Sequence, residues 1–175
     1  MTGCRQSPWS FLLAKRGPIY RLGLVPNIRV YTGLPSHRYS GTDAGEVVER
    51  AGFRVRAVPA AHERIDRDER DRYLYLGYVI ETEGLRLYHT GDSLAYDGLA
   101  EELGQKPFDV LFLPINGRGP ARGVPGNMTA AEAVDLAARA HPRYLVPHHY
   151  DMFTFNTVAV EVFEAEARRR RQAIA

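Results

Sequence analysis

Three side chains with metal-binding chemistry, His62, Asp92 and His149, each come directly after a segment with the pattern of a β-strand. In sheet proteins with helices on their faces, the loops after the strands gather at one edge and form the site. Imidazole and carboxylate groups are ligands that hold zinc or manganese in proteins. The placement indicates a metal site. By base rate, a His at a strand end is more often a surface residue, and an Asp in Thr-Gly-Asp more often belongs to a turn.

The elements that must carry these residues alternate between strands and helices. Strands are predicted over residues 28–31, 53–58, 74–82, 85–89, 108–114 and 143–147, and helices over 43–51, 129–140 and 158–171. Glu83-Gly84 predicts a tight hairpin turn, and Thr129 with Glu132 forms the pattern of a capping box. Gly52 stands where a left-handed helix cap would close the first helix. This order predicts a layered α/β or α+β sheet protein.

The length of 175 residues predicts one domain, preceded by an irregular segment, 1–27, that Gly and Pro interrupt repeatedly. Apolar residues make up 45% and charged residues 25%, which excludes disorder as the dominant state. The longest apolar runs are too short for a membrane span, and no secretory signal is recognised, so we expect a cytoplasmic protein. Cys4 is the single cysteine, which excludes a disulfide framework within one chain.

The formal net charge of +2 depends on the run of four arginines at 168–171, without which the chain would be acidic. Arginines at the C-terminal end of a helix are favoured by the helix dipole and are usually solvated. We therefore do not expect nucleic acid as a partner. A nucleic-acid or anionic-membrane patch is the alternative.

Six phrases, in order, resemble the metallo-β-lactamase fold superfamily, over residues 53–157. They are Ala60-Ala61-His62, Leu76-Gly77-Tyr78-Val79-Ile80, Leu87-Tyr88-His89-Thr90-Gly91-Asp92-Ser93, Leu113-Pro114-Ile115-Asn116-Gly117-Arg118, Gly126-Asn127-Met128-Thr129 and Val146-Pro147-His148-His149-Tyr150-Asp151. The branch that they resemble most is the ascorbate-6-phosphate lactonase-like hydrolases. N-acyl phosphatidylethanolamine phospholipase D and the tRNA 3′-end endonucleases are more distant. The resemblance implies a four-layer αββα sandwich, of which residues 28–175 clearly represent mainly the C-terminal half.

The same resemblance implies roles for individual residues. His62 would bind the first metal, Asp92 would bridge both metals, and His149 would bind the second, with Asp92 and His149 as the catalytic pair. The cofactor would be zinc or manganese, one or two ions, and the reaction hydrolysis of a lactone or phosphodiester by a metal-bound hydroxide. His89 and His148 would support the ligands or pack beside them.

The Gly- and Pro-rich loop from Asn116 to Asn127 carries Arg118 and Arg122. Because Arg binds phosphate in a bidentate way, we predict that both contact a small anionic substrate, such as a phosphorylated lactone or a phosphodiester. The alternative is that both are solvated loop residues.

The chain departs from the family pattern at one motif. The superfamily carries His-x-His-x-Asp-His upstream of these elements, and this sequence has no His-x-His and no Asp-His pair. Two ligands then remain for each ion, where a catalytic zinc has three. An N-terminally truncated copy is the explanation we favour; a second chain, or carboxylates such as Glu63, Asp66 and Asp68, could also complete the site. The alternative function is a non-catalytic remnant or interaction module, and an exposed sheet face predicts self-association.

Overall fold

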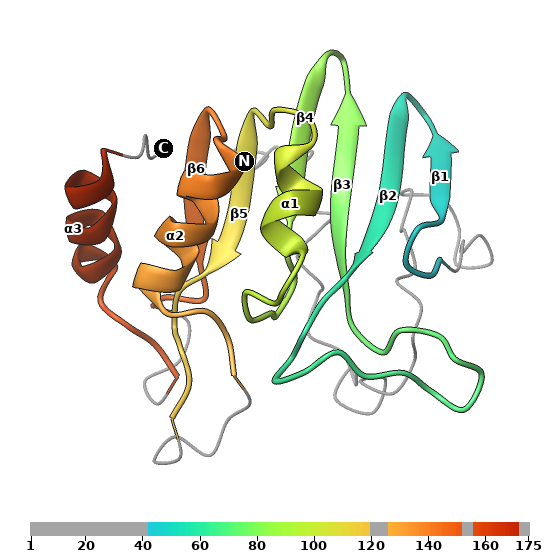
Figure 1. The fold of residues 1–175 in the computed structure, drawn as a ribbon. Helices are drawn as coiled ribbons and strands as arrows, with labels where there is room; N and C mark the ends of the chain where they lie inside the picture. The colour runs from blue at the N-terminus through green and yellow to red at the C-terminus, as the bar shows by residue number, and fades with distance from the viewer. Residues whose placement is uncertain (1–41, 120–125, 152–155, 172–175) are drawn as a thin grey trace, which may run out of the picture.

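The computed structural model describes residues 42–119, 126–151 and 156–171. In this part a six-stranded sheet carries two helices on one face, and a third helix lies beyond its last strand (Figure 1). The strands are β1 (Val47–Arg50), β2 (Phe53–Pro59), β3 (Leu76–Thr82), β4 (Leu85–His89), β5 (Val110–Pro114) and β6 (Tyr144–His148). The helices are α1 (Leu99–Gly104), α2 (Ala130–Ala140) and α3 (Val160–Arg170). None of the helices described is long and apolar enough to cross a membrane.

The strands follow one another across the sheet in chain order, β1 to β6. The first four pair antiparallel, whereas β4, β5 and β6 pair parallel. β2, β4, β5 and β6 therefore run in one direction, and their carboxyl ends meet at one edge of the sheet. The loops that leave this edge carry the residues with metal-binding chemistry.

The predicted helix over 43–51 is wrong. A strand, β1, occupies its second half and pairs antiparallel with β2, with Val47 opposite Arg56 and Arg50 opposite Phe53. The turn between them is Ala51-Gly52, and both residues have positive φ, 50° and 81°. Two positive φ values in a two-residue turn are typical of a type I′ hairpin, so Gly52 closes a hairpin and not a helix.

The other strands and helices that the sequence predicts within the described residues begin and end within two residues of the observed elements. Glu83 and Gly84, with φ of 47° and 79°, form the predicted hairpin turn between β3 and β4. The capping box is present: the Thr129 amide donates to Glu132 at 2.8 Å, and the Glu132 amide donates to the Thr129 hydroxyl at 3.3 Å. Helix α1 was not predicted, and the predicted strand over 28–31 lies outside the described residues.

The main core fills the space between the sheet and the helices. Leu111 and Leu145 from the sheet and Ala133, Val134 and Phe163 from the helices are among its almost completely buried members. Helix α3 joins this core through Phe163 and packs on α2 beside β6 (Figure 1). The alternation along the strands explains why only every second residue of the sheet belongs to this cluster.

A second buried apolar cluster lies on the opposite face of the sheet. Its members are Ala57, Leu76, Tyr78, Ile80 and Leu87. These residues alternate along β2, β3 and β4 with those that face the helices. Self-association was expected from an exposed face of the sheet, and this is the face concerned. Self-association stays a prediction.

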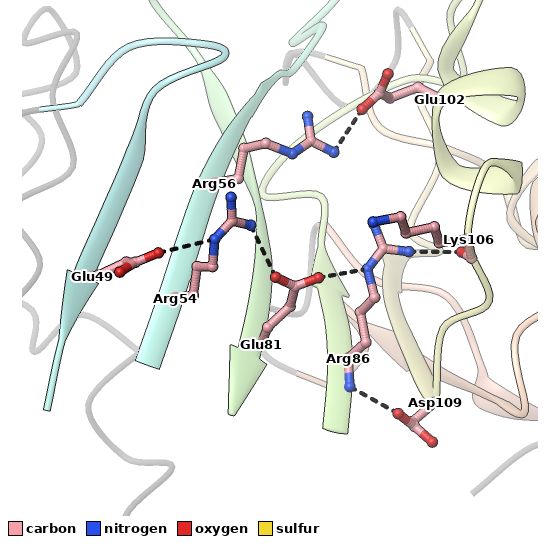
Figure 2. Close-up of polar contacts among 8 residues, drawn as sticks. All are labelled: Glu49, Arg54, Arg56, Glu81, Arg86, Glu102, Lys106 and Asp109. Carbon is pink, nitrogen blue, oxygen red and sulfur yellow. Dashed lines mark hydrogen bonds and ion pairs between the residues drawn. The ribbon is translucent and has the colours of Figure 1, made fainter. Parts of the chain in front are cut away.

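A charged network crosses the helix-facing side of the first four strands (Figure 2). Arg54 bonds Glu49 at 3.1 Å and Glu81 at 3.0 Å, and Arg86 bonds Glu81 at 3.1 Å. Further contacts tie the strands to α1 and to the loop after it: Arg56 to Glu102, the Arg86 guanidinium to the Lys106 carbonyl, and the Arg86 amide to Asp109. The network links β1 to β4 with one another and ties β2 and β4 to α1 and the loop after it.

The arginines at the end of α3 have acidic partners. Arg168 pairs with Glu164 and Arg169 with Glu166, at 2.7 and 2.6 Å, and Arg170 pairs with Asp135 of α2. These pairs leave little free positive charge at 168–170. The predicted solvated helix end agrees with this arrangement.

Candidate metal centre

The three predicted ligands sit on loops that leave the same edge of the sheet. His62 lies three residues beyond β2, Asp92 three residues beyond β4, and His149 directly beyond β6. Two hydrogen bonds fasten the first two loops together: the Ala61 amide donates to the Ser93 side-chain hydroxyl at 3.0 Å, and the Leu94 amide donates to the Ala61 carbonyl at 2.8 Å. The fold therefore brings together residues that are up to 87 positions apart in the chain.

Both imidazoles point at the carboxylate of Asp92, one at each oxygen. His149 Nε2 lies 2.5 Å from Asp92 Oδ1, and His62 Nε2 lies 3.9 Å from Asp92 Oδ2. The His62 ring also packs against Tyr75, with the ring centroids 5.1 Å apart. The three side chains therefore form one cluster around the Asp92 carboxylate, and the role of Asp92 as a bridging ligand stays a prediction.

The backbone at His149 is strained. Its φ is +63°, which non-Gly residues adopt only at a cost of about 1–3 kcal/mol. This conformation ends β6 and turns the His149 side chain toward Asp92. Its other ring nitrogen, Nδ1, is buried and has no hydrogen-bond partner in the described ranges. Strain of this kind, held by the surrounding structure, is typical of functional sites.

Asp92 and His149 each stabilise the charged form of the other. Burial opposes the ionised form of Asp92, but the hydrogen bond from His149 and the charges of His149 and His62 outweigh it, so the pKa of Asp92 lies below its ordinary value. The hydrogen bond to Asp92 raises the pKa of His149 against the opposite effect of burial. A carboxylate that stays ionised beside two imidazoles has the charge that a divalent cation requires.

His89 and His148 lie next to the cluster, on the face of the sheet opposite the helices. Their rings stack at a centroid distance of 4.6 Å, and the His89 ring also stacks on Phe112 at 5.9 Å. Burial lowers the pKa of His89, and it lowers that of His148 well below the ordinary value. His148 Nε2 is buried without a hydrogen-bond partner in the part of the chain that the structure describes. Within the described residues neither ring makes a contact with Asp92 like that of His149, and the role of both as supporting residues stays a prediction.

Two glycines let β3 approach the loop of Asp92 closely. A Cβ at Gly91, whose φ is +63°, would lie 2.9 Å from the Leu76 carbonyl oxygen. A Cβ at Gly77 would lie 2.9 Å from the Thr90 carbonyl oxygen and 3.0 Å from that of His89. The backbones are thus in direct contact on both sides, and this contact fixes the height of Asp92 above the sheet edge.

The donor types fit a divalent metal, but the described residues do not complete its ligand set. His62, Asp92 and His149 supply imidazole and carboxylate groups, yet no group of three suitable side chains meets the geometry of a metal site within residues 42–119, 126–151 and 156–171. Two of the carboxylates that could have substituted are engaged elsewhere. Asp66 accepts from Arg64 at 2.6 Å, and Asp68 accepts from the Arg72 guanidinium and from two amides of its own loop.

Arg118, predicted to bind substrate, forms a bidentate pair with Glu132 at the start of α2. Its Nη1 lies 2.6 Å from Oε2 and its Nη2 lies 2.5 Å from Oε1, and Nη1 also donates to the Asn127 carbonyl at 3.1 Å. The guanidinium thus closes the loop on to the helix. A role for Arg118 in substrate binding stays a prediction, and Arg122 lies outside the described residues.

We expect Glu132→Gln to lower the free energy of unfolding by about 1 kcal/mol at neutral pH. The hydrogen bond from Arg118 and those from Thr129 lower the pKa of Glu132 from 4.5 to about 2 despite partial burial. Because the folded pKa is depressed, this contribution is present above pH 4.5 and is lost as the pH falls toward 2. Urea unfolding of both proteins between pH 7 and pH 3 measures it. Glu161→Gln, in the first turn of α3, is the control, and a difference that does not narrow with falling pH would contradict the assignment.

Sequence reasoning missed two contributors to the cluster. Ser93 ties the loop of Asp92 to that of His62 through the Ala61 amide, and Tyr75 packs on the His62 ring. Ser93 directly follows Asp92 in the phrase Thr90-Gly91-Asp92-Ser93, so its position in the sequence could have indicated that it supports the site. Tyr75 had no such signal, because its contact depends on how the charged loop after β2 folds back.

Comparison with known proteins identifies the family of this chain. The family model described as the beta-lactamase superfamily domain matches residues 15–150. The chain belongs to that family. The predicted superfamily and fold are thereby confirmed, whereas the lactonase-like branch stays a prediction.

Comparisons with individual proteins agree with this family. A UPF0173 metal-dependent hydrolase of Thermococcus onnurineus is 36% identical over 105 residues, 57% of this chain and 42% of the relative. A UPF0173 protein of Pyrococcus furiosus is 32% identical over 129 residues, 74% of this chain and 52% of the relative. The structure of a metallo hydrolase from Ignicoccus hospitalis superposes with a TM-score of 0.60 at 19% identity, over 78% of this chain and 56% of that one, which shows a shared fold. The chain spans about half the length of the curated relatives it matches.

Proposed function

We propose that this chain carries part of the active site of a metal-dependent hydrolase. The observation that carries the proposal is the convergence of His62 and His149 on the two oxygens of Asp92 at one edge of the sheet. The names of the relatives, metal-dependent hydrolases in several organisms, support it. The chain covers only about half the length of these relatives. Hydrolase activity of the whole protein is therefore also part of what we propose.

His62, Asp92 and His149 would hold zinc or manganese, with Asp92 between two ion positions. The ion would supply Lewis acidity and would lower the pKa of a coordinated water to about 7. The chain itself contributes orientation. The fastened loops hold His62 near Asp92, the strained turn at His149 aims its Nε2, and the ionised carboxylate offsets positive charge.

In this proposal each ion would take two ligands from the described residues, below the three that a catalytic zinc has. We propose that the remaining ligands come from a segment or chain outside the described residues. Mononuclear occupancy, with one ion held by the cluster, would need the fewest additional ligands.

For the substrate, we propose a small anionic lactone or phosphodiester. Both present a carbonyl or phosphoryl oxygen that a cation at Asp92 could polarise. Arg118, which pairs with Glu132, and Arg122 would bind a phosphate group of the substrate. Nucleic acid is not proposed, because Arg168, Arg169 and Arg170 pair with acidic side chains.

The test compares the full chain with His149→Ala, using Zn²⁺ and Mn²⁺ titrations and hydrolysis of bis(4-nitrophenyl) phosphate and of a phosphorylated lactone. We expect metal binding in the full chain and a loss of affinity greater than about 100-fold in the variant, because loss of a direct ligand exceeds the effect of a supporting residue. His141→Asn, at the exposed C-terminal cap of α2, is the matched control and should bind as the unchanged chain does.

Metal binding without hydrolysis of either substrate would restrict the proposal to a metal-binding part that needs its missing ligands. A folded chain that binds neither ion, with His149→Ala indistinguishable from it, would overturn the proposal. That result would favour a non-catalytic interaction module of the same fold.

A further inference from the structure

The turn that presents Asp92 is held by a side chain that is not among the proposed ligands. The Gly91 amide donates a hydrogen bond to His89 Nδ1 at 3.0 Å, from residue i+2 back to the side chain of residue i. This is the pattern by which Asn and Asp side chains form Asx turns. An amide can donate only to an unprotonated ring nitrogen, so the contact also fixes which nitrogen of His89 carries the proton.

The His89 ring cannot easily rotate away from this contact. It is stacked between Phe112, at 5.9 Å and 21° between the ring planes, and His148, at 4.6 Å and 18°. Both neighbours belong to the parallel part of the sheet, β5 and β6. The acceptor nitrogen is therefore held in place by the same strands that carry His149.

The turn has little freedom on its other sides. The Gly91 φ of +63° and the 2.9 Å approach that a Cβ would make to Leu76 hold the backbone against β3. The Thr90 amide donates to the Phe112 carbonyl at 3.2 Å, which ties the start of the turn to β5. Two side chains bond the Gly91 peptide groups: the Thr90 hydroxyl donates to the Gly91 carbonyl at 2.8 Å, and His89 Nδ1 accepts from the Gly91 amide.

We propose that His89 is a positioning residue that holds Asp92 in reach of His149 and His62 through the Gly91 amide. This inference rests on the proposed function, in which Asp92 is the shared ligand. It gives His89 a task distinct from packing, because a ring of the same shape without the acceptor nitrogen would keep the stack and lose the turn.

The chain allows a matched pair of variants. His89→Phe keeps a flat ring between Phe112 and His148 but removes the acceptor. His89→Asn loses most of the stack but places an amide oxygen where Nδ1 stands, because an Asn side chain accepts from the i+2 amide in an Asx turn. A packing role predicts that Phe is the better replacement, whereas a positioning role predicts that Asn is. His89→Leu replaces the Phe variant if that protein does not fold.

Two readouts separate this inference from the proposed function. The first is the Zn²⁺ affinity of the full chain, which we expect to fall about 10-fold or more in His89→Phe and to stay within about threefold in His89→Asn. The second needs no metal. The 2.5 Å contact between His149 and Asp92 should give a downfield imidazole N–H proton signal in the metal-free protein, absent in His149→Ala, retained in His89→Asn and lost in His89→Phe.

Retention of the proton signal and of the Zn²⁺ affinity in His89→Phe would overturn the positioning role while the proposed function stands. Equal losses in the Phe and Asn variants would also overturn it, since they would point to packing. If the unchanged chain binds neither Zn²⁺ nor Mn²⁺, the proposed function fails. The proton signal then decides the positioning role by itself, supported by its loss in Phe with rescue in Asn and overturned by any other pattern.

Discussion

Asp92→Asn is expected to lower the Zn²⁺ affinity of the full chain by more than about 100-fold and to reduce any metal-dependent hydrolysis to background. The substitution keeps the shape of the side chain but removes its negative charge and one of the two oxygens that face the imidazoles. Both oxygens of Asp92 face an imidazole, one on each side, so the change affects both contacts. Isothermal titration with Zn²⁺ measures the effect.

The fold should survive the Asp92→Asn change. The Asp92 side chain is 44% exposed, and an ion pair at such a position contributes at most about 1 kcal/mol to stability. Asp97→Asn, at an exposed residue five positions further along, is the control and should leave Zn²⁺ affinity unaltered. Equal affinity in Asp92→Asn and in Asp97→Asn would remove Asp92 from the metal centre.

Gly91→Ala is expected to destabilise the protein by about 3 kcal/mol. Two costs add up at this position. The φ of +63° is unfavourable for any residue with a Cβ, and that Cβ would lie 2.9 Å from the Leu76 carbonyl oxygen, a backbone atom that cannot move aside without shifting β3. Any relief of the contact must also lift Asp92 from its place, so metal affinity should fall together with stability. Chemical denaturation and a Zn²⁺ titration of the same sample report both.

Gly84→Ala separates the two costs. Gly84 has a similar φ, +79°, but nothing lies within 4 Å of the Cβ that Ala would add. We expect a loss of only about 1–2 kcal/mol there, from the left-handed conformation alone. Equal losses at Gly84 and Gly91 would show that the close approach of β3 to the loop of Asp92 contributes nothing.

The sequence predicted the elements whose signals are local. Glu83-Gly84 marked a hairpin, Thr129 and Glu132 marked the start of α2, and strand ends located His62, Asp92 and His149 near one edge. The incorrect helix over 43–51 shows the limit of such signals. Gly52 fits a helix cap and a type I′ turn equally well, and the choice is made by pairing of β1 with β2, a contact that no local pattern contains.

The details of the site depend on tertiary contacts. His149 was preferred over His148 because the family that the sequence resembles places its ligand second after the proline, and successive strand residues, which point to opposite faces, are not expected to reach the same ion. The structure reaches the same separation of the two rings by a different route, a positive φ that ends the strand at His149. The bidentate pair of Arg118 with Glu132 likewise joins residues 14 positions apart, and neither spacing nor composition indicated it.

The most direct test of the central claim, that His62, Asp92 and His149 converge on a cation, is anomalous diffraction at the zinc edge from crystals of the full chain grown with Zn²⁺. We predict an anomalous peak beside the Asp92 carboxylate, about 2.0–2.2 Å from an Asp92 oxygen and from Nε2 of at least one of the two histidines. A peak elsewhere, or none, with the 2.5 Å contact between His149 and Asp92 still intact, would contradict the account.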